Sequence, residues 1–392
     1  MHADYSIIMN MKKEKIAVFG GSFHPVHNGH IALAKHALEA LSLDRVLFVV
    51  DRIPPHKTLA EGASDAQRVD MLRLATQDEP RFSVETLELE REGTSYTVDT
   101  LTELHARKPD ADFFFLMGSD MLLSFPTWRK PDEIAKLATL VCTVREGQSG
   151  GEEQAAIDLE RRFDAKVILL DQVSPLSSTE IRSRIRDARP ITGLMHPAQE
   201  HYIYLNGCYE PNELMPMYER LHRELTAHRM EHTAYVVQTA ILLAERFGVD
   251  AGKARLAALL HDCAKSFPKE QLLPYADTEP PILPILHAPA GADYAHTVYG
   301  VDDPEVLRAI RLHTTGDADM TDLDRVVYLA DMIEPSRVYE GVDEIRNADG
   351  LKQMMRLALS RTIWYIKKRN YAVHPATERA LEALGGLDGT LR

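Results

Sequence analysis

The sequence predicts two domains of different class: an α/β domain with a parallel sheet covered by helices on both faces, then an all-α domain. In the first half, short apolar β-prone runs alternate with helical patterns, which is typical of parallel strands joined by right-handed crossovers. In the second half, helical periodicity continues without a β-rich run. At 392 residues, the chain is also too long for one ordinary domain.

The α/β half begins with an apolar strand that runs into a glycine-rich turn and then a helix. Further strands follow along the chain, and one of them ends at Gly118. Parallel sheets bind ligands beyond the carboxyl ends of their strands, so we expect a site where these strands end. The predicted strands are 16–19, 45–50, 113–117 and 166–170, and the predicted helices are 29–41, 66–76 and 179–187.

The second half is read as helices separated by loops, with the proline-rich segment 274–289 as one such loop. Its predicted helices are 217–247, 251–265, 304–313, 323–333 and 351–368. The predicted domain division is an extension over 1–14, an α/β domain over 15–207, a linker over 208–216 and a helical domain over 217–392. Within the extension, Met9 or Met11 is an alternative start.

The composition argues against several classes of partner. The formal net charge is −14, so the chain as a whole does not attract nucleic-acid backbones or an anionic membrane surface. Its three cysteines are widely spaced and odd in number, which favours buried thiols in a reducing compartment. Residues 1–13 lack the apolar core of a signal peptide, and no run reaches the ~20 apolar residues of a membrane span. We therefore predict a cytoplasmic protein without nucleic-acid or membrane partners.

The turn after the first strand carries the first chemical motif, GGSFHPVHNGH over residues 20–30. Its glycines allow the backbone to approach a phosphate closely, and the helix N-terminus offers N–H groups to an anion. His27 and His30 are three residues apart, so both rings can project to one side of the opening turn. Two imidazoles there can donate hydrogen bonds to a triphosphate. Taken alone, the motif is also compatible with a turn that carries two capping or exposed histidines.

Further motifs in the same half support a functional interpretation of this turn. GGSFHPVHNGH resembles the GGxF(D/H)PxHxGH signature of the nucleotidylyltransferase superfamily, whose fold is Rossmann-like. His24 stands where many relatives have Asp. The segments PPHK (54–57), GTSYTVDTL (93–101), LMGSD (116–120) and SSTEIR (177–182), together with Trp128, resemble motifs of nicotinate-nucleotide adenylyltransferases in the same order. This resemblance covers residues ~15 to ~207.

The resemblance implies transfer of an adenylyl group from ATP to nicotinate mononucleotide, which gives deamido-NAD and pyrophosphate. It implies that His27, His30, Lys57 and Arg182 act on the phosphates, and that Mg²⁺ arrives with ATP. Tyr96, Thr97 and Trp128 are then expected around the pyridine ring, although Trp128 is equally compatible with a core position. The remaining expected nucleotide contacts are Gly20, Gly21, Ser22, Phe23, Gly118, Asp120, Ser178 and Thr179.

A second group of candidate residues lies on the predicted helices of the other half. An adjacent His-Asp pair on an apolar helix places two ligand types in a core, where unpaired polar groups are costly. A salt-bridged core histidine would explain one such pair, but four more ligand-type residues make a shared metal the simpler account. Nitrogen and oxygen ligands suit iron, manganese or zinc. The candidate ligands are His232, His261, Asp262, His287, His313 and Asp331.

The order H…HD…H…H…D resembles the HD phosphohydrolase superfamily, and two histidines beyond its minimal set imply a dinuclear site, with Fe or Mn expected. The phrases around the ligands resemble symmetrical diadenosine-tetraphosphate hydrolases over residues ~215 to ~375. This implies cleavage of diadenosine tetraphosphate, or a related nucleotide, to two ADP. Asp262 is then a catalytic residue as well as a ligand, and Lys265 and Arg337 are expected phosphate contacts.

Alternatives remain open for each half. The first could transfer a nucleotidyl group to another acceptor, although SYTVDT and Trp128 argue against this. The second could hydrolyse a different nucleotide, or bind one as a regulatory module without turning it over. A homo-oligomer is compatible with the sequence. The fusion suggests a hypothesis: the hydrolase removes dinucleoside polyphosphates formed by misdirected adenylyl transfer, and deleting it should then alter product purity.

Overall fold

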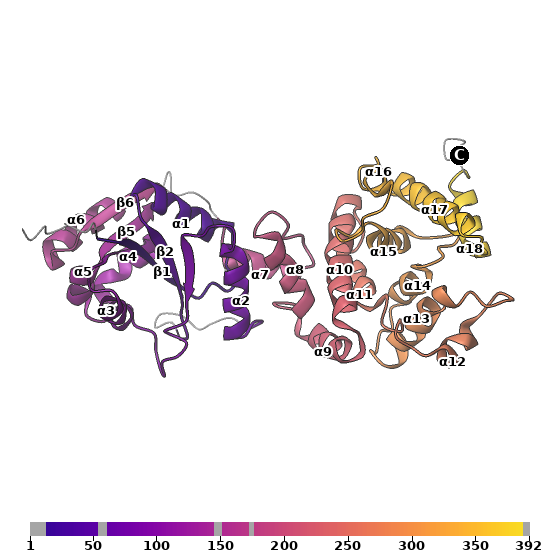
Figure 1. Cartoon of the computed structure of the whole chain (residues 1–392), viewed down its shortest axis with the longest axis horizontal. Coiled ribbons are helices and arrows are strands. Elements are labelled where there is room, and N and C mark those ends of the chain that lie inside the picture. Colours follow the sequence, from indigo (N-terminus) through magenta and orange to yellow (C-terminus); the bar gives the residue numbers. More distant parts are fainter. Residues whose placement is uncertain (1–12, 54–60, 145–150, 172–175, 387–392) are drawn as a thin grey trace, which may run out of the picture. The chain divides into compact units, whose positions relative to one another are not determined.

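The structure, a computed structural model, describes residues 13–53, 61–144, 151–171 and 176–386. The chain forms two compact units, Met1–Arg182 with Gly193–Gln199 and Ser183–Thr192 with Glu200–Arg392. The first unit is built on a sheet, and the second is helical in all of its described regular structure (Figure 1). The predicted fold class is therefore confirmed.

The first unit contains one six-stranded parallel sheet. Its order is β3-β2-β1-β4-β5-β6, so the chain moves outward from β1 in one direction and then from β4 in the other. The carboxyl ends of β1 and β4 therefore form a switch point, where such sheets bind ligands. The strands are β1 (Lys15–Gly21), β2 (Arg45–Val50), β3 (Phe82–Glu85), β4 (Asp112–Gly118), β5 (Thr139–Val144) and β6 (Val167–Asp171).

Helices cover both faces of this sheet (Figure 1). One helix, α3, was not predicted, although its apolar positions Val98, Leu101 and Leu104 recur every third residue and are buried. The helices of the first unit are α1 (Asn28–Ala40), α2 (Asp65–Thr76), α3 (Thr97–Arg107), α4 (Ser119–Ser124), α5 (Pro131–Leu137) and α6 (Glu152–Phe163), with a 3₁₀ turn, η1 (Phe125–Thr127). Two further helices, α7 (Ser178–Arg186) and α8 (Pro197–Asn206), begin in the first unit and end in the second.

The core of the first unit lies along the central strands. Val18 on β1, Val49 on β2 and Phe115 on β4 are all at most 3% exposed and belong to one hydrophobic cluster. Strands buried on both faces read as continuous apolar runs, which is why β1, β2 and β4 were recognisable in the sequence.

The second unit is a bundle of helices that begins with a 3₁₀ turn, η2 (Asn212–Leu214). Two more 3₁₀ turns, η3 (Leu273–Tyr275) and η4 (Leu283–Ile285), occur in its proline-rich segment. Its helices are α9 (Met215–Glu224), α10 (Ala227–Phe247), α11 (Ala251–Leu260), α12 (Lys269–Leu272), α13 (His287–Thr297), α14 (Pro304–Leu312), α15 (Asp322–Ile333), α16 (Val342–Arg346), α17 (Leu351–Lys368) and α18 (Pro375–Ala383).

Three predicted elements of this unit were wrong in detail. The single helix predicted over 217–247 is two helices, because Leu225 is extended and the Thr226 side chain caps α10 by accepting from the Arg229 N–H. The helix predicted over 251–265 ends at Leu260. The loop predicted over 274–289 already contains η4 and the start of α13.

The division into units differs from the predicted boundaries at 207 and 216. Arg255 on α11 donates to the carbonyl oxygen of Ile185 at 2.9 Å and pairs with Glu210 Oε2 at 2.8 Å. These contacts hold residues 183–192 and the predicted linker segment against the helical unit. Glu210 is 4% exposed, so this part of the predicted linker is a packed segment.

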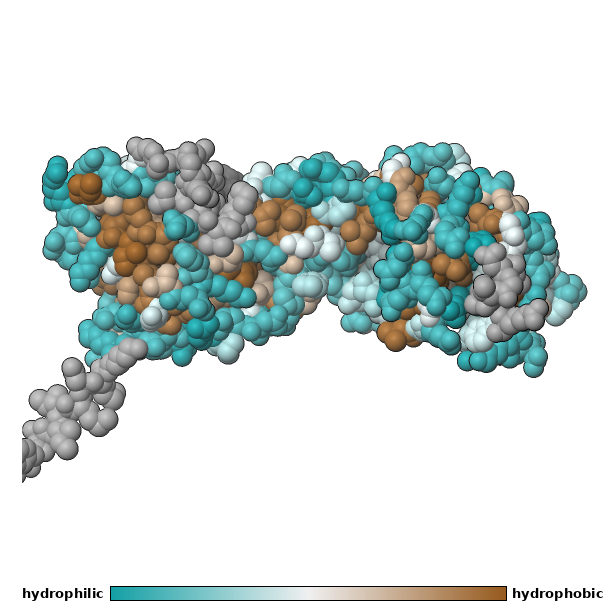
Figure 2. Space-filling model, turned by 90° about the horizontal axis from the view of Figure 1, so that it is seen from above, coloured by the Kyte–Doolittle hydropathy of each residue, from teal (hydrophilic) through white to brown (hydrophobic). Residues whose placement is uncertain are grey.

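The exposed surface is mostly hydrophilic on the face drawn in Figure 2, with separate apolar patches. Large hydrophobic side chains that remain exposed include Leu123, Ile157 and Trp364. In the part of the chain that the structure describes, no helix combines the length and the apolar character needed to cross a bilayer.

Candidate active sites

The first candidate site is the turn between β1 and α1, at the switch point of the sheet. Ser22, Phe23, His24 and His27 are each at most 9% exposed. Phe23 has a φ of 44°, which turns the backbone sharply after the strand. The turn hands over to α1 with His27 as the N-cap residue. The predicted residues Gly20 and Gly21 end β1 directly before it.

The rings of His27 and His30 lie against each other at the start of α1, with their planes tilted by 34°. Their ring centroids are 3.7 Å apart, and the His27 N–H donates to His30 Nδ1 at 3.2 Å. Burial lowers the pKa of His27 from 6.5 to about 4, so its ring is neutral at pH 7. The predicted convergence of these two rings is what the structure has.

Gly29 lets this pair form. A Cβ atom at this position would lie 2.9 Å from His27 Nδ1 and 3.0 Å from its Cε1, closer than side chains normally approach. The position between Asn28 and His30 therefore requires glycine to make room for the His27 ring, independently of any approach to phosphate.

Two predicted phosphate contacts bind the turn itself. Arg182 Nη1 donates to the His24 carbonyl oxygen at 2.7 Å, and Ser178 Oγ donates to that of Pro25 at 2.8 Å. Thr179 accepts from Arg182 Nη2 at 3.2 Å and is exposed. Arg182 and Ser178 therefore hold the backbone of the turn, whereas Thr179 contacts Arg182.

The other predicted residues of this half lie at the ends of β4 and the start of α3. Gly118 precedes α4, and Asp120 in its first turn is exposed. Tyr96 and Thr97 are half-buried, and the Arg129 guanidinium lies 4.5 Å from the Tyr96 ring centroid. Lys57 lies outside the described residues.

Trp128 lies at the edge of the core. Its ring packs against Phe125 at 5.3 Å and Phe115 at 6.0 Å between centroids, at the edge of the hydrophobic cluster. It is nevertheless half-exposed, and its Nε1–H donates to Ser124 Oγ at 3.4 Å. One side of the ring is thus supported by the core.

The second candidate site gathers all six predicted ligands in the helical unit. They come from α10, α13 and α15 and from the residues that directly follow α11 and α14. His261, Asp262, His287 and His313 are each at most 3% exposed. Three overlapping groups each bring three ligand atoms within 4.8 Å: His232, His261 and Asp262; His261, His313 and Asp331; and Asp262, His287 and His313.

Asp262 occupies the centre of this arrangement. Its Oδ1 lies 3.0 Å from His287 Nε2 and 3.6 Å from His313 Nε2, and its Oδ2 lies 3.8 Å from His261 Nε2. The remaining pair, His232 Nε2 and Asp331 Oδ1, is 3.0 Å apart. A carboxylate shared between two ligand groups is what a bridging ligand requires.

The imidazole rings are oriented by their outward nitrogens. His261 and His313 each directly follow a helix, and each Nδ1 lies 2.7 Å from the carbonyl oxygen three residues earlier. His232 Nδ1 lies 3.2 Å from Glu334 Oε1. A hydrogen bond at one ring nitrogen fixes which nitrogen is left to bind a metal.

Glu334 was missed in the sequence analysis. It is fully buried and accepts hydrogen bonds from the backbone N–H and the hydroxyl of Ser336. Its place directly after α15, three residues beyond Asp331, was the available signal, because a carboxylate beside ligand residues is a common partner of a ligating histidine.

The electrostatics suit metal ligands. Burial lowers the pKa of His261 to about 3 and that of His287 to about 4, which keeps both rings neutral. Burial also favours neutral His232, but hydrogen bonds with Asp331 and Glu334 outweigh it and raise the pKa to about 9. His261 and His287 are therefore in the neutral form that binds a metal, whereas His232 is protonated between its two carboxylates and must release that proton to bind one.

The chemistry of the donor set fits a divalent metal. Among the described residues, buried His261 Nε2 has no hydrogen-bond partner, and an orphaned buried nitrogen is costly unless something binds it. The six residues thus provide four inward nitrogens and two carboxylates in a buried cluster.

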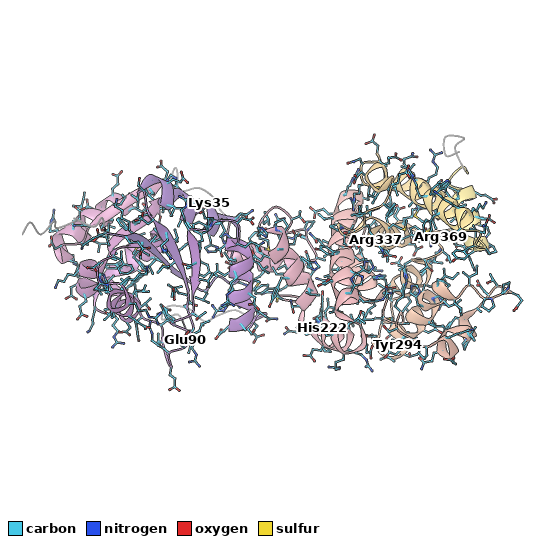
Figure 3. The ribbon with its side chains drawn as sticks, viewed as in Figure 1. Lys35, Glu90, His222, Tyr294, Arg337 and Arg369 are labelled. Carbon is cyan, nitrogen blue, oxygen red and sulfur yellow. The ribbon has the colours of Figure 1, made fainter. Side chains whose placement is uncertain are left out.

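Three cationic side chains lie around this cluster. Lys265 Nζ is 2.9 Å from His287 Nε2 and 3.4 Å from Asp262 Oδ1. Arg337 donates to Asp331, and it lies in the segment that follows α15 (Figure 3). Arg229, which the sequence analysis did not single out, pairs with Asp262 Oδ2 at 3.0 Å and is 37% exposed. Phosphate groups are suitable ligands for these cations.

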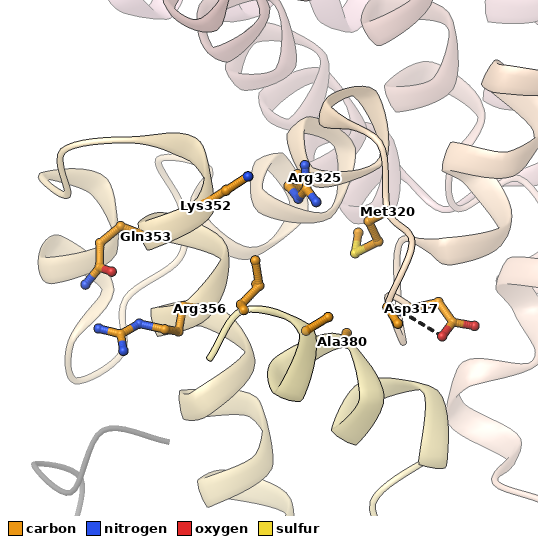
Figure 4. A pocket seen from close by; sticks show the side chains of 10 residues that line it. Asp317, Met320, Arg325, Lys352, Gln353, Arg356 and Ala380 are labelled. Carbon is orange, nitrogen blue, oxygen red and sulfur yellow. Dashed lines mark hydrogen bonds between the residues drawn. The ribbon is translucent and has the colours of Figure 1, made fainter. Parts of the chain in front are cut away.

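A separate pocket of about 340 Å³ lies elsewhere in the helical unit (Figure 4). Its lining includes Arg325, Lys352 and Arg356, and none of the six candidate ligands contributes to it. The pocket is therefore distinct from the metal-ligand cluster.

Comparison with known proteins gives both sites a family context. The model described as Cytidylyltransferase-like matches residues 18–184, and the HD domain model matches residues 229–336. A "Probable nicotinate-nucleotide adenylyltransferase" of Geobacillus thermodenitrificans is 39% identical over 195 residues, which cover 50% of this chain and 86% of that protein.

One further relative matches most of the chain, and one solved structure matches part of it. The "Probable nicotinate-nucleotide adenylyltransferase/Ap4A hydrolase" of Mycoplasma pneumoniae is 29% identical over 361 residues, covering 89% of this chain and 98% of that protein. A crystal structure named "predicted HD superfamily hydrolase involved in NAD metabolism", from Clostridium acetobutylicum, is 35% identical with a TM-score of 0.41 and covers 42% of this chain and 93% of that one. The chain therefore belongs to the nicotinate-nucleotide adenylyltransferase family and carries an HD domain after its adenylyltransferase unit.

Proposed function

We propose that this chain is a bifunctional enzyme. The first unit transfers the adenylyl group of ATP to nicotinate mononucleotide, which yields deamido-NAD and pyrophosphate. The second hydrolyses diadenosine tetraphosphate symmetrically to two ADP. The observation that carries the first activity is the His27–His30 pair at the switch point of the sheet. The observation that carries the second is the six-ligand cluster around Asp262.

In the adenylyl transfer, a phosphate oxygen of nicotinate mononucleotide attacks the α-phosphorus of ATP. The bond from that phosphorus to the oxygen bridging to the β-phosphate breaks, and pyrophosphate leaves. No side chain becomes covalently bound, so catalysis rests on positioning and on stabilising charge. His27 and His30 donate to the ATP phosphates, Lys57 adds a cation, and Mg²⁺ arrives with ATP.

The remaining residues of the first site bind the two nucleotides. Gly118 and Asp120, at the carboxyl end of β4, contact the ribose of ATP. Tyr96, Thr97 and Trp128 surround the pyridine ring, which stacks on the side of Trp128 that is not packed against the core. The roles of Arg182 and Ser178 are to hold the turn after β1, in keeping with their hydrogen bonds to its carbonyl oxygens.

In the hydrolysis, His232, His261, Asp262, His287, His313 and Asp331 hold a pair of divalent metals, with Fe or Mn the expected ions. Bound metals of this kind supply an activated water and neutralise phosphate charge. Arg229, Lys265 and Arg337 bind the polyphosphate chain. One water adds, the bond between the second and third phosphates breaks, and both products are ADP.

Single-residue variants of the full-length protein separate the two activities. Asp262→Ala should abolish ADP formation from diadenosine tetraphosphate in the presence of Mn²⁺ or Fe²⁺, and should leave deamido-NAD formation unchanged. His30→Ala should give the reverse pattern. His296→Ala is the matched control for the hydrolase, because His296 is exposed and outside the ligand groups.

The activities of the wild-type protein decide the function of each unit separately. Wild-type protein that makes deamido-NAD but no ADP would identify the helical unit as a different nucleotide hydrolase or a regulatory nucleotide-binding module. Wild-type protein that makes ADP but no deamido-NAD would point to another acceptor for the first unit, which a screen of mononucleotides would identify. The cytoplasmic location and any homo-oligomer remain predictions.

A further inference from the structure

Arg68 is fully buried in the first unit, on the first turns of α2. A charged guanidinium is costly to remove from water unless acceptors surround it. Arg68 meets this condition with backbone as well as carboxylate oxygens. These contacts show which segments of the chain the buried guanidinium holds together.

The guanidinium bridges the ends of two neighbouring strands. Nη1 donates to the carbonyl oxygen of Ser22, in the turn after β1, at 2.7 Å. Nη2 donates to the carbonyl oxygen of Asp51, directly after β2, at 2.6 Å. Asp65 Oδ1 at 2.8 Å and Asp51 Oδ1 at 3.4 Å balance its charge. The planar fork of arginine is needed to reach both backbone oxygens at once.

Gln199 holds the same turn from another side. It is fully buried, and its Nε2–H donates to the Val26 carbonyl oxygen at 2.8 Å. Together with Arg182 on His24 and Ser178 on Pro25, four carbonyl oxygens of the turn are bound by side chains at least 46 positions away in the sequence.

These bonds set the direction of the peptide units. The C=O and N–H of a planar trans peptide point in opposite directions, so fixing a carbonyl fixes the N–H that follows it. Holding the Ser22 and Pro25 carbonyl oxygens thus aims the N–H groups of Phe23 and Val26 away from the core contacts. N–H groups aimed in this way can bind phosphate without reorganising.

Arg68 is also linked, through the residues that follow β2, to the segment proposed to bind nicotinate mononucleotide. Directly after Asp51, the Arg52 N–H donates to Ser95 Oγ at 3.1 Å, and the Ser95 N–H donates to the Ile53 carbonyl oxygen at 3.0 Å. Tyr96 and Thr97 follow immediately. A short run of hydrogen bonds therefore joins the ATP-binding turn to the pyridine-binding segment through one guanidinium.

We propose that Arg68 and Gln199 are positioning residues of adenylyl transfer, which hold the ATP-binding turn in register with the acceptor segment. The proposal rests on the adenylyltransferase function proposed above. Both side chains are fully buried, so they act through the backbone of the turn. In-line transfer depends on the relative placement of two bound nucleotides, and displacement by about 1 Å can cost on the order of 100-fold in rate.

The test compares Arg68→Lys, Arg68→Met and Gln199→Leu in the full-length chain. Lysine keeps the charge but loses the fork, so kcat should fall in the order wild type, Arg68→Lys, Arg68→Met, by up to about 100-fold. The KM for ATP should change far less, because each nucleotide still binds. Arg73→Lys is the matched control, since Arg73 lies on the same helix, its side chain is 62% exposed, and its guanidinium pairs with Asp70 at 3.6 Å.

A readout independent of activity accompanies the kinetics. Hydrogen exchange of the peptide spanning residues 20–30 should accelerate in the three variants and stay unchanged in Arg73→Lys. A purely structural role would instead lower the melting temperature while folded protein kept wild-type kcat and wild-type exchange in this peptide, and that result would overturn the proposal.

The remaining outcomes are also decisive. If the Arg68 variants fail to fold, Gln199→Leu alone decides, because normal kcat in that variant contradicts the proposal. If wild-type protein makes no deamido-NAD, the proposed function fails for this half. The exchange measurement would then still report whether Arg68 and Gln199 hold the turn.

Discussion

The imidazole of His232 joins two carboxylates: its Nδ1 lies 3.2 Å from Glu334 Oε1, and its Nε2 lies 3.0 Å from Asp331 Oδ1. Glu334 therefore fixes the ring from behind, while the opposite nitrogen points into the ligand cluster. Because Ser336 in turn holds Glu334, the orientation of one candidate ligand depends on a turn outside the predicted set.

Glu334→Gln should weaken metal binding by the helical unit. The amide keeps the shape but lacks the charge that favours an Nδ1–H donor, and loss of such a partner typically costs roughly 10- to 100-fold in metal affinity or activity. Isothermal titration calorimetry with Mn²⁺ measures the change in metal affinity. Glu245→Gln, an exposed position on the same helix as His232, serves as the control. Equal affinities in both variants would mean that Glu334 only closes the turn.

His287→Ala should change metal stoichiometry rather than remove all metal. His287 belongs to one of the three ligand groups, whereas His261 and Asp262 each belong to two. A dinuclear site should therefore fall from roughly two ions per chain to roughly one. Elemental analysis of purified protein gives the ratio, with His296→Ala expected to match wild type. The same ratio in His287→Ala and wild type would argue against a second metal at that position.

Gly29→Ala should disrupt adenylyl transfer through His27. The new Cβ would overlap the His27 ring, so the ring must move away from His30. We expect kcat to fall by about 100-fold, as for other small misplacements of reacting groups. The control is Gly252→Ala, at an exposed position in the first turn of α11, where alanine should leave transfer unchanged. Steady-state kinetics with both substrates tests this, and wild-type kcat in Gly29→Ala would show that the close His27–His30 pair is dispensable.

The first unit should lose stability as the pH falls from about 6.5 towards 4. Burial lowers the pKa of His27 to about 4, so between these values the unfolded chain binds a proton that the folded chain does not. Between pH 7 and pH 5 this contributes at most about 2 kcal/mol of destabilisation.

The comparison is between wild type and His27→Asn. With Trp364→Phe as the shared background, Trp128 is the only remaining tryptophan and reports on the first unit. Urea unfolding at pH 7 and pH 5 gives the free energy of unfolding at each pH. Its decrease between pH 7 and pH 5 should be smaller for His27→Asn than for wild type. Identical pH dependence of the two proteins would show that His27 titrates normally.

How much the sequence revealed depended on how continuous each pattern was. Strands β1, β2 and β4 are buried on both faces and were recognisable as apolar runs. The strand β3, four residues with only Phe82 buried, has no such pattern. The break between α9 and α10 was missed because apolar periodicity continues across Thr226, and a single capping residue ended the helix.

The candidate sites follow the same rule. His27, His30 and the six metal-ligand residues were predicted because their chemistry is local in sequence or carried by distinctive residue types. Arg68, Gln199 and Glu334 were not, since each acts through a tertiary contact with a backbone oxygen or a histidine far along the chain. A lone Arg, Gln or Glu on or beside a helix is expected to be a surface residue until its burial is known.

The chain passes from the first unit to the second at Arg182, returns at Gly193 and leaves again at Gln199. No single truncation can therefore separate the two activities cleanly. A protein ending at residue 182 lacks Gln199, whereas one ending at 199 keeps residues 183–192 without the Arg255 side chain that binds them. Truncation at a single site would therefore remove contacts from one unit or the other. Point variants in the intact chain are the better way to assign each activity.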